Sequence, residues 1–190
     1  MKDSLRGANS PVLLLAGGGI DSTLCMHRLR EAQLQFRALH IDYGQQANHL
    51  EWDAVKVTSK HFGGTAAQLK IAGSQKFSPG EVIGRNAAFI FLALMHRLPS
   101  ERLICIGIHA GTPFYDCSKV FFENTARLVA EHTDSLVRLI APLIDYTKPE
   151  IVGSLRATDI DLGLTYSCQR GIEGGFGSCH SCLDRRSLGC

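Results

Sequence analysis

A short apolar run that ends in three glycines and leads into a helix is the feature that most restricts the fold of this chain. Val12–Leu15 is apolar at every position, and Ala16 and Gly17–Gly19 follow it directly. A strand without polar alternation is typical of a parallel sheet that is covered on both faces. Residues 22–32 then have the pattern of a helix. A strand, a glycine turn and a helix in this order predict an α/β unit.

The same alternation continues along the chain. Further strands are predicted at residues 36–41, 68–71, 103–108 and 136–140, and further helices at residues 47–62, 86–97, 118–132 and 147–157. Strands that alternate with helices favour an α/β fold with a doubly wound, mostly parallel sheet. Ligands of such sheets bind beyond the carboxyl ends of the strands, so we expect the functional site at that edge.

The composition changes near residue 163 and divides the chain in two. With 190 residues, the chain has the length of one domain with a small appendage. Residues 1–162 carry the alternating pattern and are predicted to form the α/β domain. Residues 163–190 hold clustered glycines with cysteines on both sides. We expect this part to be an irregular, cysteine-rich segment that something other than an apolar core holds in place.

Charge, hydropathy and cysteine content disfavour several classes of protein. Lys plus Arg is 20 and Asp plus Glu is 18, so the net charge of +2 gives no support to direct nucleic-acid binding. No apolar run approaches the roughly 20 residues that span a membrane, and the first residues show no secretion signal, so we expect a cytoplasmic protein. Seven cysteines without an export signal favour metal binding or reactive thiols over disulfides.

The glycine loop has the properties of an anion site. Glycines let backbone N–H groups converge, and the start of a helix adds unpaired donors and partial positive charge. Ser22 and Thr23 could add hydroxyl donors to phosphate oxygens. The loop has neither the Gly-Lys-Ser/Thr ending of the Walker type nor the spacing of the dinucleotide fingerprint. The alternative is a plain turn in which Asp21 and Ser22 only cap the helix.

Six motifs in order, between about residues 12 and 186, resemble those of a known family. The loop at residues 16–23 resembles the Ser-Gly-Gly-x-Asp-Ser pyrophosphate loop (PP-loop) of N-type ATP pyrophosphatases. The remaining motifs resemble those of the 7-cyano-7-deazaguanine synthase (QueC) family: Tyr43-Gly44-Gln45 with Glu51, Gly84-Arg85-Asn86, Tyr115-Asp116-Cys117, Lys148-Pro149-Glu150-Ile151, and Ser167-Cys168 with Cys179, Cys182 and Arg185. The chain is similar to a diverged, shortened member, which implies the adenine nucleotide alpha hydrolase type of sheet.

The resemblance implies an ATP-dependent carbon–nitrogen ligase of queuosine biosynthesis that acts on 7-carboxy-7-deazaguanine. The substrate carboxylate would attack the α-phosphorus of ATP, pyrophosphate would leave, and ammonia would convert the acyl-adenylate to an amide and, after a second activation, to a nitrile. The implied site has three parts: ATP and Mg²⁺ at Ala16, Gly17, Gly18, Gly19, Asp21, Ser22 and Thr23; catalysis by Asp21, Ser22, Arg85 and Lys148; and substrate binding by Tyr43, Gln45, Arg85, Asn86, Tyr115 and Asp116.

The cysteines of the last segment predict a metal site. Cys179-x-x-Cys182 has the spacing that brings two thiolates to one tetrahedral ion such as Zn²⁺. Cys168 would supply a third ligand, and we expect Cys190 as the fourth, with His180 or water as alternatives. The alternative interpretation is a set of reduced, unpaired thiols.

Three departures from the family pattern bear on the activity. Gly17 stands where the loop motif has its first Ser, Phe176 stands where the family has another cysteine, and the segment before Gly84 is short. Family members carry a longer insertion in that segment, which helps to close the substrate site and the dimer. The resemblance also leaves room for a homodimer here.

Three other functions stay open at this point. The first is a relative, like those in antiphage operons, that stops at the amide or transfers the activated deazaguanine to an amine of a partner protein. The second is a catalytically inactive nucleotide-binding module. The third is a tRNA-thiolating pyrophosphatase, which the weak net charge and the absence of an added RNA-binding domain disfavour.

Overall fold

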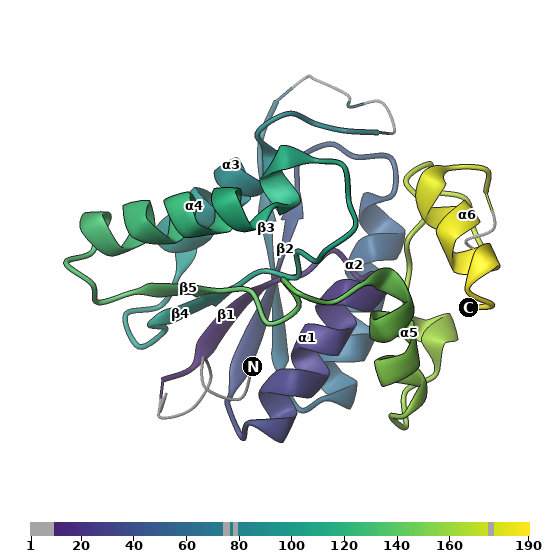
Figure 1. Cartoon of the computed structure of the whole chain (residues 1–190), viewed down its shortest axis with the longest axis horizontal. Coiled ribbons are helices and arrows are strands. Elements are labelled where there is room, and N and C mark those ends of the chain that lie inside the picture. Colours follow the sequence, from purple (N-terminus) through teal and green to yellow (C-terminus); the bar gives the residue numbers. More distant parts are fainter. Residues whose placement is uncertain (1–9, 74–76, 78–79, 175–176) are drawn as a thin grey trace.

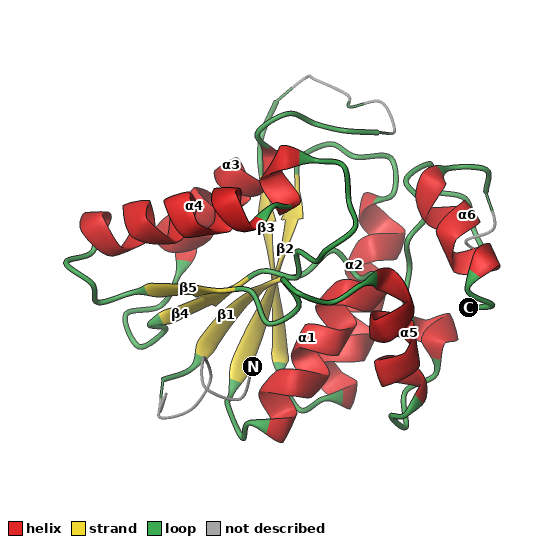
Figure 2. Cartoon of the chain, viewed as in Figure 1, coloured by secondary structure: helices red, strands yellow, loops and turns green. Residues whose placement is uncertain are grey.

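The chain forms a parallel sheet with helices on both faces (Figures 1 and 2). The computed structural model describes residues 10–73, 77, 80–174 and 177–190. The strands are β1 (Val12–Leu15), β2 (Phe36–Asp42), β3 (Thr65–Lys70), β4 (Leu103–Cys105) and β5 (Arg138–Ile140). They lie in the order β3-β2-β1-β4-β5, and every neighbouring pair is parallel. The predicted doubly wound fold is therefore confirmed.

Two layers of helices cover the sheet. Helices α3 (Arg85–His96) and α4 (Lys119–His132) lie on one face, and α1 (Ile20–Glu31), α2 (Asn48–His61) and α5 (Lys148–Arg156) lie on the other (Figure 1). The strand order reverses at β1, because β2 lies on one side of it and β4 on the other. The carboxyl end of β1 is thus the place where such sheets leave a crevice for ligands.

The side chains of β1 pack alternately against the two helix layers. Leu13 and Leu15 face the apolar core beneath α3 and α4, whereas Val12 and Leu14 face the core beneath α1, α2 and α5. Val12, Leu13 and Leu14 are completely buried. A strand that is buried on both faces needs apolar residues at every position, which explains the uninterrupted apolar run in the sequence.

Strands β3 and β4 differ most in extent from the prediction. Strand β3 begins at Thr65, earlier than the predicted residue 68, because the small side chains of this edge strand hide its pairing with β2. Strand β4 ends at Cys105 and not at residue 108. The chain leaves the sheet there at Gly107, where an added Cβ would lie 3.3 Å from the backbone carbon of Asp21. This close approach brings the end of β4 to the start of α1.

Residues 163–190, called the tail below, contain more regular structure than predicted. The tail begins within a short 3-10 turn (Leu162–Leu164), and it carries the helix α6 (His180–Ser187), which lies beside α2 and α5 (Figure 1). The division of the chain at residue 163 stays a prediction. Within the described part of the chain, no helix combines the length and apolar character needed to cross a bilayer.

Candidate functional site

The glycine loop connects β1 to α1 at the carboxyl edge of the sheet, as predicted. Gly18 adopts a left-handed backbone conformation with φ +74°, and an added Cβ would lie 2.6 Å from the carbonyl oxygen of Glu51 in α2. Only glycine fits this position. By contrast, an added Cβ at Gly17 would meet no atom within 4 Å, so this side of the loop is open.

The two hydroxyls after the loop are turned toward the loop's own backbone. Ser22 and Thr23 both donate a hydrogen bond to the carbonyl oxygen of Gly19, at 3.0 and 2.9 Å. Both side chains are buried, and Thr23 is completely so. In this arrangement the predicted hydroxyl donors stabilise the first turn of α1 and do not point to the open side of the loop.

Asp21 pairs with Lys148, a lysine 127 positions further along the chain. The Lys148 ammonium lies 2.7 Å from both carboxylate oxygens of Asp21, and the imidazole of His109 lies 3.9 Å from one of them. Lys148 opens α5, where Thr147 and Glu150 form a capping box and Pro149 occupies the first turn. The fold therefore brings two predicted catalytic residues together, with His109 beside them.

A second group of predicted residues gathers at the start of α3. Gly84 has φ +77° and directly precedes the helix. The backbone N–H of Asn86 donates to the carboxylate of Asp116 at 3.3 Å, and its side-chain amide donates to the Asp116 carbonyl at 3.0 Å. Burial raises the pKa of the neighbouring Cys117 thiol, which therefore stays protonated and fits a packing role better than a nucleophilic one.

The segment after β2 forms a third group, with a partly buried carboxyl group at its centre. Gln45 accepts a hydrogen bond from the Tyr43 amide at 2.9 Å and donates one to the carboxylate of Glu51 at 2.9 Å. Burial raises the pKa of Glu51 against the opposing effects of this hydrogen bond and of the Arg85 charge. Glu51 was expected only as part of a motif. Its hydrogen bond to Gln45 and the nearby Arg85 charge, which no local sequence pattern indicates, make it part of this group.

The two predicted tyrosines, Tyr43 and Tyr115, differ in their neighbours and exposure. The Tyr43 ring packs at 5.3 Å from the rings of Phe77 and Phe89, whereas the Tyr115 ring is 64% exposed and touches Phe121. A partly buried ring that already has aromatic neighbours serves packing, while an exposed ring can stack on a ligand. Of the two, Tyr115 is the better placed to meet a planar base.

Three cysteines of the tail come together, as predicted. The sulfur atoms of Cys168, Cys179 and Cys182 all lie within 4.8 Å of one another, and all three residues are buried. Burial raises the pKa of Cys168, but hydrogen bonds, first those from the backbone amides of Ile172 and Arg170, outweigh it and lower the pKa to about 7. Burial and the neighbouring thiols raise the pKa of Cys182 to about 11. Sulfur ligands of one zinc ion lie roughly 3.8 Å apart, so the cluster could hold a metal.

The expected fourth ligand, Cys190, is not part of this cluster. Its side chain packs against the apolar core beneath α1 and α5. Arg156 of α5 donates hydrogen bonds to the carbonyl oxygens of Leu188 and Gly189, which draws the end of the chain away from the other thiols. His180 is exposed and also lies outside the cluster, and Phe176 lies outside the described residues.

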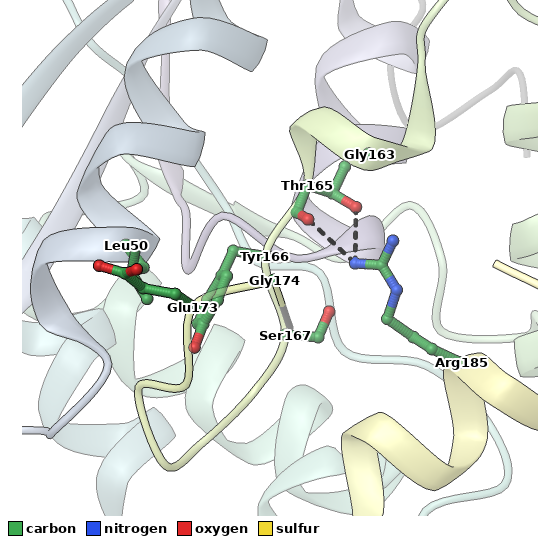
Figure 3. A pocket seen from close by; sticks show the side chains of 8 residues that line it. All are labelled: Leu50, Gly163, Thr165, Tyr166, Ser167, Glu173, Gly174 and Arg185. Atoms are coloured by element: carbon green, nitrogen blue, oxygen red, sulfur yellow. Dashed lines mark hydrogen bonds between the residues drawn. The ribbon is translucent and has the colours of Figure 1, made fainter. Parts of the chain in front are cut away.

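The tail is docked directly onto the glycine loop. The backbone N–H of Tyr166 donates to the carbonyl oxygen of Gly18 at 2.8 Å. Arg185 of α6 donates to the carbonyl and hydroxyl oxygens of Thr165, at 3.0 and 2.9 Å (Figure 3). A pocket of about 220 Å³ opens beside this contact, and its walls are Leu50, Gly163, Thr165, Tyr166, Ser167, Glu173, Gly174 and Arg185 (Figure 3).

Comparison with known proteins gives the family. A family profile described as "Queuosine biosynthesis protein QueC" matches residues 11–79 and 65–188. The chain belongs to the QueC family. It is 31% identical to the 7-cyano-7-deazaguanine synthase of Azoarcus sp. (strain BH72), over 92% of this chain and 90% of that protein. The corresponding protein of Methanothermobacter thermautotrophicus is 26% identical, over 90% of each chain.

A solved structure shares the fold of this QueC family member. The predicted subunit of a tRNA methyltransferase from Methanocaldococcus jannaschii has a TM-score of 0.51 over 77% of this chain and 74% of that one. The two sequences are 12% identical, so this likeness concerns the fold alone.

Proposed function

We propose that this protein uses ATP to activate the carboxylate of 7-carboxy-7-deazaguanine for attack by ammonia, with AMP and pyrophosphate as products. The observation that carries the proposal is the gathering, at one edge of the sheet, of a glycine loop open on one side, the Asp21–Lys148 pair, and Arg85 at the start of α3. The 7-cyano-7-deazaguanine synthases that the chain resembles give the substrate class.

The glycine loop is the proposed binding site for the pyrophosphate part of ATP. The backbone N–H groups of Gly17–Gly19 and the unpaired first amides of α1 would donate to phosphate oxygens. A carboxylate is a poor acyl donor because its leaving group would be oxide, and adenylation gives it AMP as a leaving group. Donors fixed in place where negative charge grows on the departing pyrophosphate stabilise the transition state most.

Asp21 and Lys148 are proposed to exchange partners when the nucleotide binds. Each now neutralises the other, through two contacts of 2.7 Å. Asp21 is the carboxylate that would hold Mg²⁺, which when bound would neutralise phosphate charge. Lys148 would then pair with phosphate oxygens, and Arg85 would orient the α-phosphate or the substrate carboxylate. The deazaguanine would lie near Tyr115 and Asp116, beside the open start of α3.

The thiol cluster is proposed to hold one structural zinc ion. Cys168, Cys179 and Cys182 would be its protein ligands, and the ion would fix the tail against the glycine loop without taking part in the reaction. A pKa of Cys168 near 7 fits this role, because a metal binds the thiolate form. The proposal includes the division into an α/β domain over residues 1–162 and a metal-binding segment over residues 163–190.

The experiment is incubation of the purified chain with Mg-ATP, 7-carboxy-7-deazaguanine and ammonium, followed by mass spectrometry of AMP, amide and nitrile. We expect AMP that depends on the carboxylate substrate. Lys148→Ala should lower the rate at least tenfold, whereas Lys119→Ala, at an exposed lysine that pairs with Asp145, should leave it unchanged. No AMP from the wild-type chain would contradict the proposal and favour an inactive nucleotide-binding module.

A reaction that ends at the amide is the second candidate function. The chain between the end of β3 and the start of α3, residues 71–84, is short for the family, and the resemblance associates a longer segment there with closure of the substrate site. A less closed site would favour release of the amide before its second activation, or transfer to an amine of a partner protein. AMP and amide without nitrile in the same experiment would select this candidate.

A further inference from the structure

Ser167 brings a hydroxyl group from the tail to the glycine loop. The segment from Thr165 to Cys168 runs past the loop, and its position is fixed by the hydrogen bond from the Tyr166 amide to the Gly18 carbonyl. A Cβ added at Gly19 would lie 3.5 Å from the Ser167 hydroxyl oxygen. This oxygen therefore lies beside the last loop residue before α1, although almost 150 residues of chain separate the two.

The Ser167 hydroxyl has its proton available for a ligand. Among the residues that the structure describes, no hydrogen bond of this side chain is present, and the residue is only partly buried. The nearest loop carbonyls already accept hydrogen bonds from other groups. Gly18 accepts from the Tyr166 amide, and Gly19 accepts from the hydroxyls of Ser22 and Thr23. A donor that faces an anion-binding loop and has no protein acceptor is suited to a phosphate oxygen.

The loop itself lacks such a donor. The motif it resembles begins with a serine, and this chain has Gly17 at that position. The hydroxyls of Ser22 and Thr23 are directed to the helix backbone. Within the described part of the chain, Ser167 is thus the hydroxyl beside the loop whose proton no protein atom accepts.

We propose that Ser167 donates a hydrogen bond to the polyphosphate of the nucleotide, and that it does at this loop what a side chain at Gly17 would otherwise do. This inference rests on the proposed nucleotide site and adds to it a residue from the tail. The adjacent Cys168 belongs to the thiol cluster, so the same cluster that orders the tail fixes the position of this hydroxyl. Figure 3 shows Ser167 on the strip of chain between Leu50 of α2 and Arg185 of α6.

The first test is calorimetric binding of ATP, inorganic pyrophosphate and AMP to the full chain. Ser167→Ala should weaken binding of ATP and pyrophosphate about tenfold, the usual effect of losing one hydrogen bond to a charged group. Binding of AMP should change less than twofold, because AMP lacks the phosphates that this hydroxyl meets. Ser167→Thr, which keeps the hydroxyl, should bind ATP nearly as the wild type does. Ser187→Ala is the matched control. It removes a tail hydroxyl that donates a hydrogen bond to the backbone carbonyl oxygen of Asp184.

The second test replaces the hydroxyl lost in Ser167→Ala by one at position 17 of the loop. An added Cβ at Gly17 meets no atom within 4 Å, so Gly17→Ser is accommodated. Combined with Ser167→Ala, it should recover most of the lost ATP affinity, and it should add little to the wild-type chain. Equal losses for AMP and ATP, or no rescue by Gly17→Ser, would mean that Ser167 acts only through the structure of the tail, and would overturn the inference.

The outcomes separate this inference from the proposed function. If the wild-type chain binds ATP and Ser167→Ala binds it equally well, the role of Ser167 is wrong and the nucleotide site stands. If the wild-type chain binds neither ATP nor pyrophosphate, both are wrong. The variants are compared at equal metal content, with circular dichroism as the check that each is folded.

Discussion

The sheet with its five covering helices and the tail differ in what holds them together. In the sheet region, here called the body and comprising the described residues up to 162, two continuous apolar cores lie on either face of β1. In the tail, the buried side chains are few, and Cys168, Cys179 and Cys182 form a large part of them. Helix α6 buries only Cys182 among its eight residues.

This difference shows how the two regions divide the site between them. The glycine loop belongs to the body, and the tail reaches it through a polar contact, the hydrogen bond from the Tyr166 amide to Gly18, while the Arg185 guanidinium holds the neighbouring Thr165. A short segment with little apolar surface cannot offset its loss of chain entropy by burial alone. A metal ion at the thiol cluster would supply the missing stabilisation.

The largest expected effect is on the tail. Cys182→Ser removes one ligand of the thiol cluster, so the metal content measured by plasma mass spectrometry should fall from about one ion per chain to almost none. Limited proteolysis should then cleave within residues 163–190 first. The thermal unfolding of the body should change little, because no body core residue is altered.

Cys190→Ser is the matched control for this prediction. Cys190 lies outside the cluster and packs on the body, so this variant should keep its metal. Metal loss from Cys190→Ser would show that the last residue is a ligand after all, and an unchanged metal content in Cys182→Ser would show that the cluster is a set of free thiols.

The second prediction compares one substitution in the two regions. Leu24 of α1 is completely buried, and Leu24→Ala should lower the free energy of unfolding by about 2–5 kcal/mol through the cavity that it leaves. Leu183 of α6 is 48% exposed, and Leu183→Ala should lower it by less than about 0.5 kcal/mol. Urea unfolding followed by circular dichroism measures both. Similar losses for the two variants would mean that the tail is packed like the body.

The fold of the body could be predicted from sequence because its strands and helices have strong local patterns. The uninterrupted apolar run at Val12–Leu15 indicated a doubly covered strand, and the helix predicted from residue 147 is α5, which begins at Lys148. The parallel topology then placed the loop, Arg85 and Lys148 at one edge. The length of β3 was not predictable, since Thr65–Lys70 is half polar and its pairing with β2 is a tertiary contact.

The side-chain geometry of the site and the regular structure of the tail could not be predicted from the sequence. The pair between Asp21 and Lys148 joins residues that are 127 positions apart, and nothing local indicates it. Helix α6 has too few apolar residues for its sequence to predict a packed helix. Its one buried residue is Cys182, which lies in the cluster with Cys179. Cys190 was expected to be a ligand from residue type and spacing, but the Arg156 contacts that hold its neighbours elsewhere depend on the fold.

A smaller effect than that of Leu24→Ala is expected for an ion pair in the body, and its pH dependence separates the two regions. Glu101 is 2% exposed and accepts two hydrogen bonds from Arg37 of β2, at 2.7 and 2.8 Å, and one from the Leu98 amide. Burial alone would raise the pKa of Glu101, but these bonds outweigh it and lower the pKa. Glu101→Gln should therefore lower the unfolding free energy at pH 7 by about 1–3 kcal/mol.

The sign of the pH dependence follows from the lowered pKa. The stabilisation by Glu101 is complete above the unfolded-state pKa of about 4.3 and is lost as the pH falls through the lower folded-state value. Thiolate ligands instead exchange their metal for protons in weaker acid, so the tail should release its metal at a higher pH than the one at which the body unfolds. Parallel titrations of metal release and of unfolding test this order. If wild type and Glu101→Gln lose stability alike below pH 4, the ion pair does not contribute to the stability of the body. If the body unfolds before the metal leaves, the tail is the more acid-resistant region.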